Sequence, residues 1–196
     1  MINSSKITNF SPHLQIAGLM PNDSSIEFVG VRQSQKVMWL QNGTNHYFSD
    51  LPLEFYTLLK EAYLTDHKAV DFLSQVAENL KTQVELYTYY MYGALDSTPD
   101  IKNGVLGPSE NFRHSRNCPS LLWESKNMNI GAHIFTPRQI VIVDLISDNL
   151  PDKAIAAALG ITIKTLDSHK SRLFRALRVT TKTELLHLSI LYKIPV

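Results

Sequence analysis

The stretch D-K-A-I-A-A-A-L-G-I-T-I-K-T-L-D-S-H-K-S-R-L-F-R-A-L (152–177) decides the fold of the last third of this 196-residue chain. Its first part predicts a short helix, Lys153 to Leu159, because small and apolar side chains recur there at helical spacing. Gly160 fits the left-handed residue that ends such a helix. Thr162 is then a typical cap for a longer helix that runs to about Leu177. We therefore expect a short helix, a tight turn and a second helix.

Two capping boxes lie on either side of this stretch and predict two more helices. The first is formed by Thr136 and Gln139, with a proline between them at the first helical position. The run that follows, 140–146, is apolar enough for a buried strand, but the proline and the capping box favour a helix. Thr181 and Glu184 form the second box. The C-terminal region is therefore predicted to be an all-α domain of four helices.

Charge is distributed unevenly along the chain. Residues 134–196 contain nine Lys and Arg against five Asp and Glu, a net charge of +4, while the whole chain carries only +1 and the remainder −3. On the longer helix, Leu166, Leu173 and Leu177 fall on one stripe and the bases fall on the other faces. A basic run alone is equally typical of a solvated helix face. Together with the helix, turn, helix order it predicts a helix-turn-helix whose second helix enters the major groove of DNA.

The residues from Phe135 to about Leu191 resemble the LuxR/GerE-type helix-turn-helix domain of bacterial transcription regulators. That domain usually opens with L-T-P-R-E, continues with an I-A-x-x-L-G-I turn and reads DNA with a T-V-x-x-H-x-x-x-I-x-x-K-L helix. This chain has F-T-P-R-Q, I-A-A-A-L-G-I and T-L-D-S-H-K-S-R-L-F-R-A-L. The resemblance implies sequence-specific binding of double-stranded DNA by the helix Thr162–Leu177, as a homodimer, with RNA polymerase as a further candidate partner.

The resemblance also implies roles for individual residues, at the positions that match the family pattern. Base reading is expected from one side of the longer helix, where Arg172 is the candidate for a bidentate guanine contact; the full set is Thr165, Asp167, Ser168, Ser171 and Arg172. Phosphate contacts, which orient without specifying sequence, are expected from the surrounding bases, namely Lys153, Lys164, Lys170 and Arg175. Dimerisation is expected through the last helix, at Leu185, Leu188 and Tyr192.

Four positions depart from the family pattern, the mildest being Gln139, which replaces a glutamate and keeps the capping geometry. Asp167 stands where a lysine or another polar residue is usual; an acid repels phosphate, but it can accept a hydrogen bond from cytosine N4. It therefore either changes base preference or weakens DNA binding. The second possibility keeps an alternative open, a protein–protein interaction module that keeps the helix-turn-helix fold with weak or no sequence-specific DNA binding. Asn149 and Arg178 replace glycines, and Asn tolerates the left-handed conformation more readily than Arg.

The first two thirds of the chain predict a β-hairpin followed by helices, so the fold class of the whole chain is α+β. Asn42-Gly43 between two alternating runs is a strong hairpin signal. The predicted strands are Ile26–Val31, Lys36–Gln41 and Thr44–Phe48. The predicted helices are Asp50–Tyr63, with Pro52 in its first turn, and Asp66 to about Gly93, as one long helix or two short ones.

An aromatic cluster ends this helical region, with Leu86, Tyr87, Tyr89, Tyr90, Met91 and Tyr92. It is more typical of a core or a subunit interface than of a ligand-stacking site. The next part of the chain is rich in Gly, Pro, Asn and Ser, although Trp123 argues against a fully solvated linker. We therefore divide the chain into an α+β dimerisation or sensing domain (1–95), an irregular connecting segment (96–133) and the helix-turn-helix domain (134–196).

Other classes of function are disfavoured by missing motifs. No glycine-rich phosphate loop, nucleophile elbow or His-Glu-x-x-His sequence occurs, so we expect no enzyme and no cofactor. His114 and Cys118 have a ligand-like spacing and His133 could be a third ligand, but the set is incomplete and we expect no metal. The single cysteine fits a reducing cytosol. Without a signal peptide or a membrane-spanning apolar run, we expect a cytoplasmic protein with no membrane partner.

Overall fold

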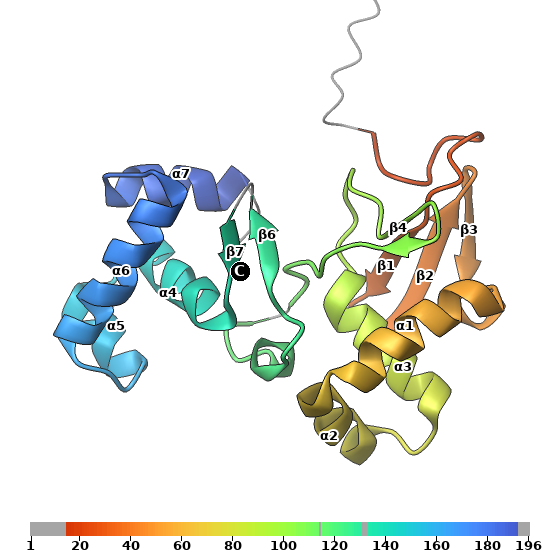
Figure 1. The fold of residues 1–196 in the computed structure, drawn as a ribbon, viewed down its shortest axis with the longest axis horizontal. Helices are drawn as coiled ribbons and strands as arrows, with labels where there is room; N and C mark the ends of the chain where they lie inside the picture. Colours follow the sequence, from red (N-terminus) through yellow and green to blue (C-terminus); the bar gives the residue numbers. More distant parts are fainter. Residues whose placement is uncertain (1–14, 114, 131–132, 192–196) are drawn as a thin grey trace, which may run out of the picture.

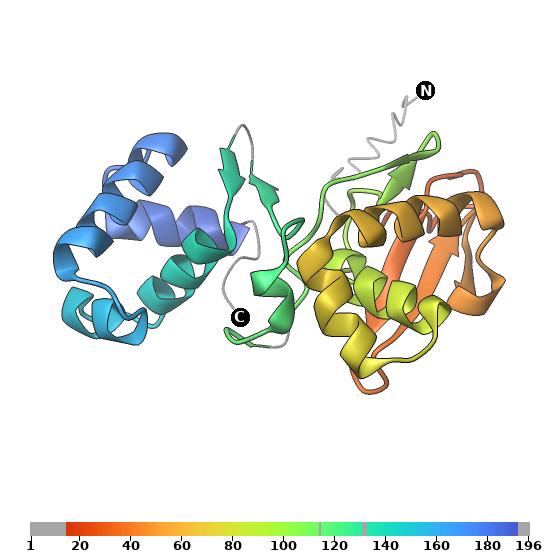
Figure 2. The same cartoon turned by 60° about the horizontal axis from the view of Figure 1, so that its bottom comes forward.

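The structure is a computed structural model that describes residues 15–113, 115–130 and 133–191. It contains an N-terminal body (residues 15–106) and a C-terminal body (residues 128–130 and 133–191), which lie at opposite ends of the long axis (Figure 1). A bridging segment, residues 107–113 and 115–127, runs between them, as the second view also shows (Figure 2). In the described part of the chain, no helix has both the length and the apolar character needed to cross a membrane.

The N-terminal body opens with a three-stranded antiparallel sheet, in the order β1 (Glu27–Val31), β2 (Lys36–Gln41) and β3 (Thr44–Tyr47). The turn between β2 and β3 places Asn42 at φ 51° and Gly43 at φ 77°. These two positive values are those of the hairpin turn that Asn-Gly favours. The predicted hairpin is therefore confirmed, and β1 extends it to three strands.

Three helices follow the short 3-10 turn η2 (Phe48–Asp50): α1 (Leu53–Thr65), α2 (His67–Val76) and α3 (Leu80–Tyr92). The first begins after Pro52 rather than at Asp50. The stretch predicted as one long helix or two short ones is two helices, because Ala77 is extended and Asn79 caps α3 by accepting from Thr82 N at 3.0 Å. Helix α3 packs on β1 and β2, and α1 and α2 pack on α3.

The aromatic cluster on α3 forms the core of the N-terminal body. Tyr87, Tyr89 and Met91 are fully buried, and Tyr92 is nearly so. Trp123 of the bridging segment stacks on Tyr87 with ring centroids 5.7 Å apart. The core interpretation is confirmed, and the segment that connects the two bodies contributes aromatic rings to this core, Trp123 among them.

The part of the chain predicted to be irregular contains several short elements: β4 (Ile101–Lys102), β5 (Val105–Leu106), η3 (Pro119–Leu122), β6 (Met128–Ile130) and β7 (His133–Phe135). Strands β4 and β5 form one two-stranded sheet, and β6 and β7 form another. Residues Ile26 and Ile101 form a bridge that attaches the first of these sheets to the start of β1. Such short pairings depend on neighbours far along the chain, so local sequence gives little sign of them.

The C-terminal body places four helices after the β6–β7 hairpin: α4 (Pro137–Ser147), α5 (Asp152–Ala158), α6 (Ile163–Leu177) and α7 (Lys182–Leu191). Both predicted capping boxes are present, because Thr136 pairs with Gln139 and Thr181 with Glu184. The apolar side chains of the core are mainly aliphatic, with Phe135 as an aromatic one, and include Ile140, Val143, Ile155, Leu166, Leu173 and Leu185. The α+β class and the all-α helix-turn-helix are thus confirmed, with a β-hairpin added in front of α4.

Candidate nucleic-acid interface

The turn between α5 and α6 is fixed by backbone contacts of the kind that end helices. Gly160 adopts φ 63°, where a side chain is disfavoured, and Ile161 N donates to Ala156 O at 3.0 Å. Arg138, at the start of α4, donates from Nη2 to Leu159 O at 2.8 Å. The basic residue of the T-P-R-Q opening therefore supports the turn that sets the angle between α5 and α6. This role was not foreseen from the sequence.

The first turn of α6 is closed by threonine hydroxyls. Thr162 Oγ1 accepts from Thr165 N at 3.1 Å, and the two hydroxyl groups lie 2.9 Å apart. The predicted cap is confirmed. Because the first amides of a helix carry partial positive charge, this end of α6 favours negatively charged groups of a ligand.

Helix α6 separates an apolar face from a polar one. Leu166 and Leu173 are both 0% exposed and pack in the core of the C-terminal body. All five residues predicted to read bases lie on exposed faces of the helix: Thr165, Asp167, Ser168, Ser171 and Arg172. The structure therefore brings these five together on one outward surface, as the helical spacing requires.

Two of these side chains have unused bonding capacity. Within the described residues, neither the Asp167 carboxylate nor the Arg172 guanidinium has a hydrogen-bond partner. By contrast, Ser168 Oγ donates to Lys164 O at 3.0 Å, one turn back along the same helix. An acceptor and a planar donor on one exposed helix are the two groups that match cytosine N4 and the O6/N7 edge of guanine.

The predicted phosphate contacts fall into two groups. Lys153, Lys164 and Arg175 are exposed. Lys170 is half-buried, and its ammonium binds both carboxylate oxygens of Asp152, the nearer at 2.7 Å. Because that charge is already paired, the ion pair ties α5 to α6, and Lys170 has less charge to offer a phosphate than the other three residues have.

The last helix changes the expectation for dimerisation. Leu185 is fully buried, in a helix that packs on α4, so it belongs to the core of the body rather than to a free face. Leu188 is half-buried, and Tyr192 lies outside the described residues. Among the α7 side chains whose burial the structure describes, Ile190 is a large apolar one that is exposed, at 64%. Helical spacing identified an apolar face here, but it could not tell which part of it the same chain covers.

Two acids of the C-terminal body are neutralised by arginines that precede it. Arg113 makes a two-pronged ion pair with Asp144 on α4, and both side chains are 0% exposed. Arg116 pairs with Asp148 at the end of α4, at a partly exposed position. Because both carboxylates are paired with arginines from outside residues 134–196, the net positive charge of the C-terminal body is larger than the count over those residues suggests. The signal that was missed is Asp144 itself, because an acid inside an apolar helix requires a partner.

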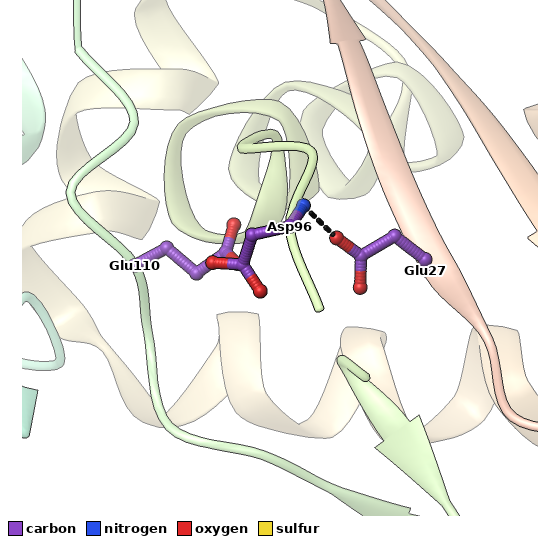
Figure 3. A group of neighbouring side chains, drawn as sticks. All are labelled: Glu27, Asp96 and Glu110. Atoms are coloured by element: carbon purple, nitrogen blue, oxygen red, sulfur yellow. Dashed lines mark hydrogen bonds between the residues drawn. The ribbon is translucent and has the colours of Figure 1, made fainter. Parts of the chain in front are cut away.

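A cluster of acids lies far from α6, where the N-terminal body meets the bridging segment. Oxygens of Glu27, Asp96 and Glu110 all lie within 4.8 Å of one another (Figure 3). Asp96 N donates to Glu27 Oε1 at 2.6 Å, and Ala94 N donates to Glu110 Oε2 at 2.9 Å. Burial, together with the charges of Glu110 and Glu27, raises the pKa of nearby Asp100 well above its usual value. The raised pKa favours the protonated form of Asp100, and backbone amides donate to Glu27 and Glu110. Both effects reduce the repulsion among these acids.

The residues considered as zinc ligands lie in other surroundings. Cys118 is buried, with its Sγ 3.2 Å from Ser120 Oγ. His133 lies in β7 and packs against the ring of Phe135, 5.0 Å away. His114 lies outside the described residues. Among the described residues the structure assembles no ligand set around Cys118.

Residues 133–189 match the family described as bacterial regulatory proteins, luxR family, so this segment is a luxR-type helix-turn-helix domain. The response regulator Rre1 of Synechocystis is 36% identical over 56 residues, which are 29% of this chain and 24% of that protein. The probable transcriptional regulator ycf29 of Cyanophora paradoxa is 37% identical over 65 residues, 33% of this chain and 30% of that protein. The chain thus spans less than a third of the length of these relatives. No solved structure matches it.

Proposed function

We propose that this chain is a bacterial transcription regulator that reads duplex DNA in the major groove with α6. The observation that carries the proposal is the outward face of that helix, held by a luxR-type scaffold, on which Asp167 and Arg172 are exposed and unpaired within the described residues. The relatives named as regulators match this same part of the chain.

In this proposal, Arg172 donates two hydrogen bonds to guanine and Asp167 accepts one from cytosine N4, with Thr165, Ser168 and Ser171 beside them. Phosphates are bound by Lys153, Lys164 and Arg175, and to a lesser extent by Lys170. The protein acts as a homodimer through the side of α7 that α4 leaves uncovered, around Leu188 and Ile190. A two-fold dimer places its two reading helices in half-sites about one helical turn apart, roughly 34–36 Å.

The test is selection of the purified full chain on random duplex DNA at two salt concentrations, followed by sequencing. We expect inverted half-sites and an affinity that falls steeply with salt. Arg172→Ala should weaken binding to the selected site by about 1–3 kcal/mol and relax the preference at one base pair. Lys153→Ala is the matched control, because a lost phosphate contact weakens binding to all sequences alike.

The alternative is a protein-interaction module on the same scaffold. Asp167 favours it, because an exposed acid in the reading face opposes phosphate. Asp167→Lys separates the two: a DNA reader changes its base preference at one position, whereas an interaction module gains only salt-sensitive, sequence-independent binding. No enrichment by the natural chain, together with no loss on Arg172→Ala, would contradict DNA reading and leave the alternative.

A further inference from the structure

Two adjacent residues of the bridging segment insert into different bodies. Phe112 is 7% exposed and packs edge-on against Tyr89 of α3, with ring centroids 5.0 Å apart. Room for the ring exists because positions 30 and 93 are glycines. A Cβ on Gly30 would lie 2.5 Å from the ring of Phe112, and a Cβ on Gly93 would lie 2.6 Å from it. The N-terminal body therefore holds this ring in a tight socket.

The next side chain, Arg113, is buried against the C-terminal body. Its Nη2 donates to Asp144 Oδ1 at 2.8 Å, Nη1 donates to the other carboxylate oxygen, and Nε donates to Asn111 Oδ1 at 2.6 Å. A paired guanidinium and carboxylate that are both 0% exposed resist separation, because either charge alone would stay buried without compensation. Phe112 and Arg113 thus join the two bodies across one peptide bond.

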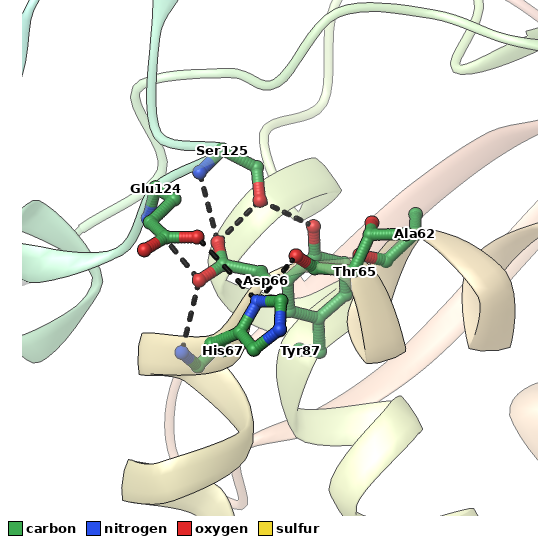
Figure 4. A network of polar contacts seen from close by, with 8 residues as sticks. Ala62, Thr65, Asp66, His67, Tyr87, Glu124 and Ser125 are labelled. Atoms are coloured by element: carbon green, nitrogen blue, oxygen red, sulfur yellow. Dashed lines mark hydrogen bonds and ion pairs between the residues drawn. The ribbon is translucent and has the colours of Figure 1, made fainter.

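The far end of the bridging segment is anchored to the N-terminal body as well (Figure 4). Asp66 is 1% exposed and caps α2 by accepting from Ala69 N, yet it also accepts from Glu124 N at 3.1 Å and from Ser125 N at 2.8 Å. Tyr87 donates to Ser125 Oγ at 3.0 Å. One buried carboxylate therefore holds both a helix and the segment in place.

Lys126 connects the two ends of the bridging segment. Its ammonium is fully buried and donates to Tyr90 O, at the end of α3, and to Phe112 O at 3.4 Å. The carbonyl that it holds belongs to the residue directly before Arg113. The segment is consequently attached to the N-terminal body on both sides of Arg113, the residue that forms the ion pair with α4.

From this geometry we infer that the bridging segment is a rigid coupling, through which the Phe112 socket of the N-terminal body sets the orientation of the helix-turn-helix. Connections between domains ordinarily leave them free to move. Here, a displacement of the Phe112 ring has to move Arg113, and with it Asp144 on α4. The reading face of α6 stays exposed, so the coupling positions that helix without covering it. The inference does not depend on DNA binding.

The experiment measures the distance distribution between spin labels on the two bodies of the full chain. Labels are attached at Glu54→Cys and Thr183→Cys, both exposed, in a Cys118→Ser background. The test variant is Arg113→Leu with Asp144→Leu, which removes the pair without leaving a buried charge, so both bodies keep their helical content. We expect a narrow distribution in the parent and one roughly twofold broader or more in the double variant. Arg116→Ala, at the exposed pair, is the matched control and should stay narrow.

A second arm tests transmission from the N-terminal body. Gly30→Ala crowds the Phe112 ring and should shift the label distance, whereas Leu59→Ala, in the buried face of α1, should not. Circular dichroism confirms that each variant is folded before it is compared. A double variant as narrow as the parent would overturn the coupling. An unshifted, folded Gly30→Ala would overturn the role of the socket.

Discussion

In the N-terminal body, buried charges and aromatic rings hold distant segments together, whereas the C-terminal body relies on local caps and aliphatic side chains. Asp66 binds amides 58 and 59 residues away, and Phe28 N donates to Asp100 across 72 residues. In the C-terminal body, the starts of α4, α6 and α7 are each closed by a side chain three residues from its partner, as at Thr162 and Thr181, whereas α5 follows Pro151 without a side-chain cap. The buried ion pair of Asp144 depends on an arginine outside the luxR-type segment.

This difference shows how far each body depends on contacts with the rest of the chain. The caps of the C-terminal body are made within it and its helices pack on one another, so these helices need little from the rest of the chain. Asp144 is the exception, because its counter-charge arrives from Arg113 in the bridging segment. A boundary drawn at residue 134 would therefore cut the domain from a residue that its core requires. The three-part division of the chain stays a prediction, and the following variants sharpen it.

The largest effect is expected from breaking the buried pair on one side. Arg113→Met leaves the Asp144 carboxylate in the core without compensation, which should lower the free energy of unfolding by about 3–5 kcal/mol. Arg116→Met breaks the partly exposed pair with Asp148 and should cost at most about 1 kcal/mol. Urea denaturation of the full chain measures both. Equal losses would mean that Asp144 does not depend on Arg113.

An intermediate effect is expected from the buried lysine of the bridging segment. Burial lowers the pKa of Lys126 to about 7, against the opposing influence of Cys118 and Glu110. In the unfolded chain the amine stays protonated up to pH about 10. Between these values the unfolded state binds more protons, so stability should rise with pH, by at most about tenfold in the unfolding constant per pH unit. Below pH about 7 both states are protonated and this dependence ends.

Denaturation midpoints across this pH window provide the check. Lys126→Met removes the titrating amine and should flatten the rise, although it also loses the hydrogen bond to Tyr90 O. Burial raises the pKa of Tyr87 to about 12, so its titration falls outside the window. An equal pH slope in the natural chain and in Lys126→Met would contradict the assignment to this group.

The smallest effect concerns the local signals of the C-terminal body. Arg178 ends α6 in the left-handed conformation, at φ 56° and ψ 35°. Arg178→Gly removes the clash of its Cβ and should raise the free energy of unfolding by about 1 kcal/mol. Asn149→Gly, at φ 58°, should change it by less than about 0.5 kcal/mol, because Asn tolerates this region. Thermal unfolding compares the two, and a larger gain at position 149 would refute the argument.

Most of the candidate site could be predicted from sequence because its signals are short in range. The capping residues, Gly160 and the spacing of Leu166 and Leu173 determined where α6 begins and which face it buries. The exposure of Asp167 and Arg172 followed from the same spacing. At Leu185 and Lys170, helical spacing could not separate packing from binding, because an apolar face and a basic side chain are each compatible with both.

Sequence alone was thus enough for the α+β class, the Asn-Gly hairpin, the luxR-type domain and the exposed face of α6, for which we propose DNA binding. Only the tertiary structure decided that Arg113 neutralises Asp144, that Asp66 and Lys126 brace the bridging segment, and that Gly30 and Gly93 make a socket for Phe112. The physical reason is the separation along the sequence between the residues that interact. A cap or a helical stripe is satisfied within one or two turns, whereas a buried charge or a ring socket is completed by residues whose distance along the chain carries no periodic signal.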